Sequence, residues 1–437
     1  MKTNNKMMSV PRVETQRSDQ VSDVSQQAGS GDLLVNNLTY EQPKALSLAV
    51  NRTFNRQYFQ RDNYSAGQTA IIDLNTGSDY IDPTNSYLTF SVLLTGTTPT
   101  ANFASGSAMN LIRQVTIRSR SGTEIDRVER ANIWARNDAL YTLPDSYLKK
   151  FGQVQGFGDT RTAADAANMD SVTATRFCIP LNRLAPFFRP LKKGLKIPPQ
   201  LASGLHMEII WEAAATAITV KSGTLTGYDI SNIQIMCDSV AMTDETQKTI
   251  NMESASTGLE YSYPRIYTSI TSLQTNQTSV SIQVRKAVSQ ACIAYGVVLD
   301  QANLIDETKD SMASVAWDTE RWQYRLGALY FPHQPIDNAT DGVESFYQSQ
   351  YMFDKVKHPY AESSVSLTEF KTGGLGMHAV TLEKDTALNL SGLPVNNSRV
   401  LEANLQFTSV PAAREVLVFL EYCCVSKSYV DNTAVSI

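Results

Sequence analysis

The stretch Tyr87-Leu-Thr-Phe-Ser-Val-Leu-Leu94 decides the fold class of this chain. Large apolar side chains occupy its even positions from 88 to 94, and Thr89 and Ser91 fall between them. Successive side chains of a β-strand point to opposite faces of a sheet. The stretch therefore predicts a strand with one face in a hydrophobic core.

The same alternation recurs along the rest of the chain. The turn Ser121-Gly122 separates two such runs, 114–118 and 124–128, which predicts a hairpin. The continuous apolar run 416–420 is typical of a strand that is covered on both faces. Further strands are predicted at 207–211, 230–240, 280–284 and 401–407. Short strands separated by turn residues are typical of β-sandwiches and jelly rolls, so we predict an all-β protein.

One segment departs from the strand pattern. Residues 128–143 have helix-forming composition, and Ile133, Asn137 and Leu140 are in helical spacing before Pro144. Asp145-Ser146 could cap a short second helix that runs through Leu148. We interpret both helices as an insertion in a loop that decorates a β-sandwich.

The chain of 437 residues is long enough for two or three domains. Residues 1–32 are polar, with four basic and four acidic side chains, and predict a flexible arm that does not bind a genome. Polar stretches at 242–249 and 254–258 show no β alternation and indicate a domain boundary. We therefore predict two tandem eight-stranded antiparallel jelly rolls, at 33–245 and 246–437.

Charge and hydropathy narrow the function. The formal net charge is -5, and the 38 basic and 43 acidic residues are interspersed, which argues against direct binding of nucleic acid. The N-terminus has no apolar signal segment, and no run of about 18 apolar residues occurs. We expect a protein that is made and kept in soluble form inside the producing cell.

The five cysteines, Cys178, Cys237, Cys292, Cys423 and Cys424, form no CxxC pair. They are interpreted as small buried side chains of a protein made in a reducing compartment. A zinc site needs ligands in close pairs, and the cysteines supply none.

Catalytic patterns are also missing from the sequence. The histidines, His206, His333, His358 and His378, are far apart and are expected to pair, cap or lie on the surface. No nucleophile elbow or Walker motif occurs, and the glycines of 373–376 indicate a turn. We predict no catalytic residue, no cofactor and no metal, and hence no enzyme.

A sugar site would need paired carboxylates and exposed aromatic platforms. Of the four tryptophans, Trp134, Trp211, Trp317 and Trp322, the third and fourth lie in a polar stretch and are the one pair left open. A carbohydrate-binding or carbohydrate-active β-sandwich is therefore one alternative. A single-jelly-roll capsid protein with a protruding β domain is another.

Two stretches carry a resemblance to a known family. Phe177-Cys-Ile-Pro-Leu181, Phe187-Phe188, Ile197-Pro198 and the strand 205–212 resemble the region from strand F to strand H in the first roll of double jelly-roll major capsid proteins. Trp322 to Ile336, which contains Tyr-Phe-Pro-His-Gln-Pro, resembles the second roll in polinton-like virus and virophage capsid proteins.

The resemblance implies a structural protein of an icosahedral DNA virus. It implies a homotrimer with six sandwiches around its axis, a pseudo-hexameric capsomer that tiles the capsid of the virion. The implied partners are further copies of the chain, neighbouring capsomers, and penton and minor capsid proteins. The resemblance leaves open whether an internal membrane lies beneath the shell.

Overall fold

The computed structural model describes residues 49–158, 169–192, 194–338, 342–353, 363–384, 391–429 and 433–436. Residues 49–437 form one unit, which is described here by itself. The expected arm at 1–32 and His358 lie outside the described residues.

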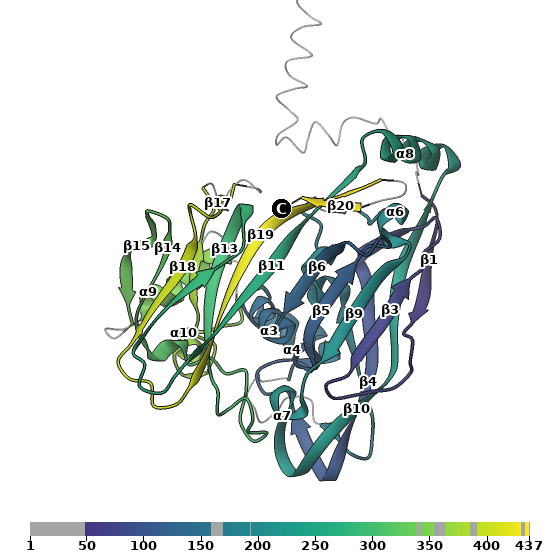
Figure 1. Ribbon diagram of the computed structural model, residues 1–437. Coiled ribbons are helices and arrows are strands. Elements are labelled where there is room, and N and C mark those ends of the chain that lie inside the picture. Colours follow the sequence, from purple (N-terminus) through teal and green to yellow (C-terminus); the bar gives the residue numbers. More distant parts are fainter. Residues whose placement is uncertain are drawn as a thin grey trace, which may run out of the picture. The chain divides into compact units, whose positions relative to one another are not determined.

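The first half of this unit contains two antiparallel sheets (Figure 1). One has the order β1-β10-β4-β7, with β2 on β10 and β8 on β4, and the other has the order β3-β9-β5-β6. Their strands are β1 (Ala49–Tyr58), β2 (Tyr64–Ser65), β3 (Thr69–Leu74), β4 (Tyr80–Asn102), β5 (Ile112–Arg118), β6 (Glu124–Glu129), β7 (Met169–Asp170), β8 (Thr175–Pro180), β9 (Leu205–Trp211) and β10 (Thr219–Met242).

The second half contains two more antiparallel sheets. One has the order β11-β19-β13-β16, with β17 on β13 and β20 on β19, and the other has the order β12-β18-β14-β15. Their strands are β11 (Leu259–Leu273), β12 (Ser279–Val284), β13 (Val288–Asp300), β14 (Thr319–Leu326), β15 (Leu329–Asp337), β16 (His378–Thr381), β17 (Leu393–Val395), β18 (Leu401–Phe407), β19 (Arg414–Ser428) and β20 (Thr433–Ser436).

The two halves share one topology. In each half the first long strand pairs with the last, β1 with β10 and β11 with β19. The second long strand of each half pairs with the long strand before the last one, β3 with β9 and β12 with β18. This nesting of early strands against late strands is the jelly-roll arrangement. The all-β double jelly roll expected from the sequence is confirmed, and the halves are called the first roll and the second roll below.

The stretch that decides the fold class lies in the centre of β4. Its apolar side chains at the even positions from 88 to 94 are fully buried in the core of the first roll, as the alternation predicts. Thr89 and Ser91 on the opposite face are buried as well. Arg176 of β8 donates to Thr89 Oγ1 at 3.0 Å, and the short helix η3 (Phe151–Gln155) packs on β8. This face of the sheet is therefore partly covered.

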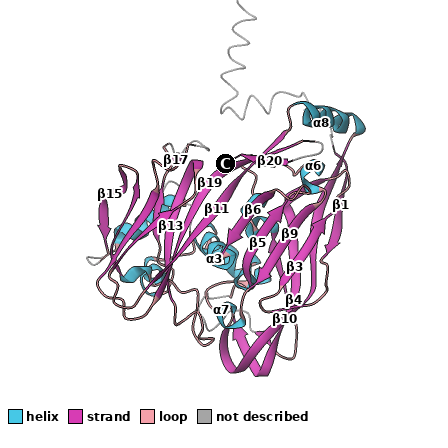
Figure 2. Cartoon of the chain, in the orientation of Figure 1, coloured by secondary structure: helices cyan, strands magenta, loops and turns pink. Residues whose placement is uncertain are grey.

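Helices join the strands, as Figure 2 shows. The two expected helices are present as α3 (Ala131–Thr142) and α4 (Asp145–Lys149). The remaining short helices are η2 (Ala108–Leu111), α5 (Leu181–Leu184), η4 (Pro186–Phe188), α6 (Pro199–Ala202), α7 (Ala214–Ala217), η5 (Ala316–Asp318), α9 (Val343–Met352) and α10 (Leu367–Thr372). Within the described ranges, no helix is both long enough and apolar enough to cross a membrane.

The polar stretch between the rolls is a helix, α8 (Asp244–Ser256). The side chain of Thr243 accepts a hydrogen bond from the backbone N–H of Thr246, and Asp244 and Glu245 lie in the first turn. A hydroxyl cap and acidic residues both stabilise the N-terminus of a helix. The segment between the rolls therefore has a structure of its own, which the search for β alternation did not reveal.

Candidate assembly surfaces

The histidines occupy three different environments in the described part of the chain. His206 of β9 is half-buried, and its Nδ1 lies 2.6 Å from Asp73 Oδ1, whereas His333 of β15 is exposed. His378 is fully buried, and its Nε2 lies 3.1 Å from the carbonyl oxygen of Ala316, so of the three expected roles it has a hydrogen-bonded pairing and not a surface position. Burial lowers the pKa of His378 to about 4, which keeps the ring neutral at pH 7.

No group of three or more His, Cys, Asp or Glu side chains within the described ranges could hold a metal ion. The tryptophan pair that the sequence left open forms no exposed platform. Trp322 is buried, and its Nε1 donates to Ser345 Oγ at 2.7 Å. Trp317 is half-buried and packs edge-on against Phe370, with the Lys371 ammonium 5.0 Å from its ring centre. Both rings therefore serve packing inside the second roll.

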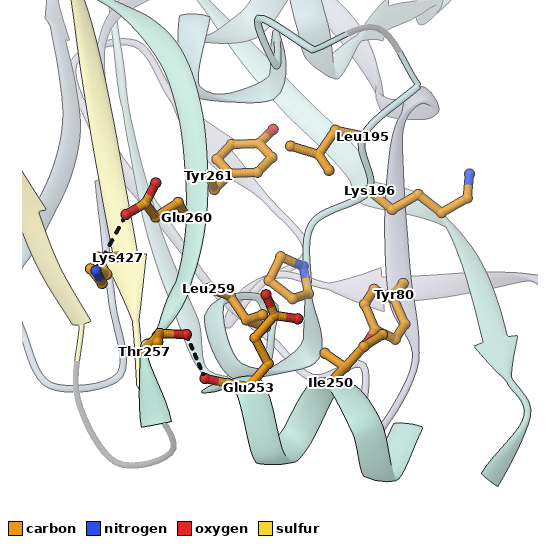
Figure 3. A pocket seen from close by; sticks show the side chains of 12 residues that line it. Tyr80, Leu195, Lys196, Ile250, Glu253, Thr257, Leu259, Glu260, Tyr261 and Lys427 are labelled. Atoms are coloured by element: carbon orange, nitrogen blue, oxygen red, sulfur yellow. Dashed lines mark hydrogen bonds and ion pairs between the residues drawn. The ribbon is translucent and has the colours of Figure 1, made fainter. Parts of the chain in front are cut away.

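A cavity of about 430 Å³ lies where α8 meets β11 (Figure 3). It is lined by residues of both rolls, among them Tyr80, Lys196, Ile250, Glu253, Tyr261 and Lys427. Lys427 is paired with Glu260 at 3.3 Å, and Tyr261 donates its hydroxyl proton to the carbonyl oxygen of Phe187. Lys196 is paired with Asp82 at 2.8 Å, so both lysines that line the cavity have carboxylate partners.

The most highly organised polar region is the seam, which we define as the contacts between the first roll and the second roll. At its centre Arg136 of α3 is fully buried. Its guanidinium donates to Ser105 Oγ and to the carbonyl oxygens of Met312 and Gly374, and lies 3.8 Å from Asp310. A single side chain of the first roll therefore satisfies several acceptors of the second.

Two tyrosines also form hydrogen bonds across the seam. Tyr141 of α3 donates to the carbonyl oxygen of Leu375 at 2.6 Å, and Tyr263 of β11 donates to that of Ile125 at 2.7 Å. Each tyrosine combines an apolar ring with a hydroxyl that finds a partner, as buried tyrosines usually do. Helix α3 was interpreted as a decoration of the scaffold, and this interpretation is wrong because the helix is buried and holds the two rolls together.

A second charged cluster lies on the first-roll side of the seam. Asp138 of α3 accepts hydrogen bonds from Arg189, at 2.8 Å and 2.6 Å, and from Arg183. Burial alone would raise the pKa of Asp138, but the two arginines outweigh it and lower the pKa to about 2. The Asp138 carboxylate is therefore charged throughout the physiological range. On the second roll, burial raises the pKa of Glu421 to about 7, although Arg189 opposes the rise.

Asp126 of β6 is expected to make the stability of the seam depend on pH. It accepts a hydrogen bond from the backbone N–H of Phe187 and lies 3.6 Å from Arg265 Nε. Burial raises the pKa of Asp126 from 3.8 to about 6, although Arg265 opposes the rise. Between these values the folded chain holds a proton that the unfolded chain has lost. This contribution to the free energy of unfolding is therefore present at acidic pH and is lost as the pH rises through 6.

The Asp126→Asn variant tests this expectation, because an amide does not titrate and can still accept from Phe187. The free energy of unfolding of the wild type exceeds that of the variant by an amount that should be about 2 kcal/mol larger at about pH 4.5 than at about pH 7.5. Urea unfolding at both pH values measures the difference. A difference that does not change with pH would show that Asp126 does not titrate in this way.

Two edge strands expose apolar side chains. On β1, the side chains of Phe54 and Tyr58 are 55% and 64% exposed. Both lie on the same face of the strand as Arg56. Arg56 lines a groove together with Val154. On β15, the hairpin residues Leu329 and Tyr330 are 49% and 45% exposed. Strands β1 and β15 lie at opposite ends of the unit 49–437 (Figure 1). Unpaired strand edges that carry apolar side chains are favourable places for another chain to dock.

Two jelly rolls in one chain are the fold of the double jelly-roll major capsid proteins of viruses, and the comparisons with solved structures find this fold. No family model matches the chain, and no curated protein matches its sequence. The Faustovirus major capsid protein superposes with a TM-score of 0.62 at 9% identity, over 95% of this chain and 98% of that one.

Two further solved structures agree with the first. The PBCV-1 virus capsid gives a TM-score of 0.61 at 11% identity, over 91% of this chain and 99% of that one. The mavirus major capsid protein gives 0.54 at 9% identity, over 100% of this chain and 96% of that one. The resemblance noted in the sequence is thus confirmed for the fold. The segment Phe177–Leu181, expected at the start of the strand F to strand H region, overlaps β8, which pairs with β4.

Proposed function

We propose that this chain is the major capsid protein of an icosahedral virus. It trimerises into pseudo-hexameric capsomers, which then tile the shell. The observation that carries the proposal is the pair of jelly rolls fixed together by the seam, a fold that matches viral major capsid proteins over nearly the whole of both chains. The proposed role is structural and not enzymatic.

The exposed strand edges support a closed ring of copies. A contact between two different surfaces of identical subunits closes into a ring when the rotation between them allows it. Phe54 and Tyr58 on β1 would meet the β15 end, with Leu329 and Tyr330, of the next copy. Three such contacts place six jelly rolls around one axis. The outline is then close to hexagonal although the symmetry is threefold.

The remaining parts of the proposal follow from this assembly. The first roll spans 33–245 and the second 246–437, and the arm 1–32 contacts a neighbouring subunit or the inner face of the shell. The chain resides in the virion. Its partners are other copies of itself, adjacent capsomers, and penton and minor capsid proteins, and it makes no direct sequence-specific contact with the genome.

The oligomeric state tests the proposal. Purified full-length protein should sediment at three times the 48.2 kDa of one chain, because the β1 and β15 surfaces are satisfied only in a ring. Electron microscopy of the same sample should show hexagonal particles. A protein that stays monomeric at micromolar concentration would contradict the proposal, and a monomer that binds glycans would favour the carbohydrate-binding alternative.

A further inference from the structure

Two cysteines that are far apart in the sequence meet in the second roll. Cys292 lies on β13 and Cys423 on β19, which are neighbouring strands of one sheet. Their Sγ atoms are 3.4 Å apart. The register of these strands shifts between Ala291 and Ile293, so the irregularity lies at Cys292 itself. The local backbone thus brings two thiols together that the spacing of the sequence does not pair.

The remaining cysteines lie in other surroundings. Cys178 and Cys237 belong to β8 and β10 of the first roll. Cys424 is buried, with its Sγ 3.8 Å from the hydroxyl oxygen of Tyr263. Cys292 is also buried, whereas Cys423 is half-buried. An oxidant in solution would therefore reach this pair through Cys423.

We propose that Cys292 and Cys423 form an intrachain disulfide when the protein passes from a reducing to an oxidising environment. A disulfide bond is about 2.0 Å long, so the two sulfurs need to approach by little more than 1 Å, within the reach of rotations of the two side chains. The link would join β13 to β19, the two central strands of the sheet. The change of environment that triggers disulfide formation rests on the proposed function, because a shell subunit is made inside a cell and leaves it in the virion.

The oxidant we name is a small-molecule disulfide such as oxidised glutathione. The Cys423 thiolate attacks one sulfur of glutathione disulfide, which forms a mixed disulfide and releases one glutathione thiolate. The Cys292 thiolate then attacks the Cys423 sulfur and releases the second glutathione. Two protein thiols are oxidised to one disulfide, one glutathione disulfide is reduced to two thiols, and the two protons pass to the leaving thiolates.

The surroundings of Cys292 favour this order of events. The hydrogen bond with Cys423 and burial both raise the pKa of the Cys292 thiol. A thiol with a raised pKa is seldom ionised and attacks slowly in bulk solution. Cys292 is therefore suited to the second, intramolecular step, in which its partner is already adjacent.

The bond would close a loop that contains most of the second roll, from β14 to β18. A disulfide stabilises a fold mainly by restricting the unfolded chain, and the effect grows with the length of the closed loop. Oxidised protein should therefore melt about 5 to 10 °C above reduced protein.

The test uses the full-length chain. After incubation with oxidised glutathione, the count of alkylatable thiols in denaturant should fall from five to three, because two are joined. Peptide mapping should recover 292 joined to 423, and the melting temperature should rise until a reductant is added. The variants Cys292→Ser and Cys423→Ser should give neither the joined peptide nor the rise in melting temperature, and Cys292→Ser should retain glutathione on Cys423 because the second step is missing. The matched variants Cys424→Ser and Cys178→Ser should keep the joined peptide and the rise in melting temperature.

Two outcomes would overturn the inference: five alkylatable thiols after oxidation, or glutathione that stays attached to Cys423. Sedimentation of the same samples separates this result from the fate of the proposed function. A linked monomer supports the disulfide and contradicts the capsid role, and an unlinked trimer does the reverse.

Discussion

Replacing Arg136 by Met is expected to lower the free energy of unfolding by about 3–5 kcal/mol. The methionine fills much of the same space but leaves Ser105 Oγ and the carbonyl oxygen of Met312 without the donor that Arg136 supplies. The carbonyl oxygen of Gly374 loses the longer of its two hydrogen bonds and keeps the one from the backbone N–H of Ser314. Buried polar groups without partners cost far more than the loss of one exposed contact. The loss falls on the seam, so the two rolls should also unfold in separate transitions.

Urea unfolding followed by circular dichroism measures both effects. The matched control is Arg118→Met, because Arg118 pairs with Glu208 at 2.6 Å but is 39% exposed. That change should cost at most about 1 kcal/mol, as exposed ion pairs usually do. Equal losses in the two variants would mean that Arg136 contributes no more than a surface arginine and that the rolls are held together by other contacts.

The double variant Phe54→Asp, Tyr58→Asp should convert the proposed trimer into monomers. Both side chains are more than half exposed on the edge strand β1, so the substitutions leave the core intact. In a ring, each aspartate would be buried against an apolar neighbour without a partner. Truncating a central aromatic anchor commonly costs about 2–4 kcal/mol of binding, so association should weaken at least about 100-fold.

Sedimentation equilibrium measures the association, and an unchanged circular dichroism spectrum shows that the chain still folds. The matched control is Val172→Asp with Ile305→Asp, because these side chains are 87% and 81% exposed and lie on neither β1 nor β15. This control should remain trimeric. A trimer that survives in the β1 variant would place the contact between copies elsewhere on the surface.

Strand positions could be predicted from the sequence because alternation is a local property. The runs at 207–211, 280–284 and 401–407 all lie within strands that bury their apolar face. The helix α8 was missed although its signal is local, since Thr243 followed by two acidic residues is a helix start. The spacing of α3 predicted the helix but gave no indication of its partners.

Most of the candidate site could not be predicted, because its contacts join residues far apart in the chain. Arg136 meets Gly374 only after both rolls have formed, and Cys292 meets Cys423 only after β13 has paired with β19. The buried position of His378 depends likewise on the packing of β16 beside β13. No periodicity in a single sequence encodes such pairings. The resemblance to a capsid family supplied the fold without these contacts.

The pairing of β1 with β10 has a consequence for biosynthesis. A ribosome releases the amino end first, so β1 must wait for β10 until nearly two hundred further residues have emerged. Folds that depend on such distant pairings form slowly. Once the first roll closes, Arg136 and Tyr141 still face a partner that has not been translated. A nascent chain halted at this point should expose an unpaired surface that is prone to aggregate. The second half of translation is therefore the period when this protein most needs a chaperone.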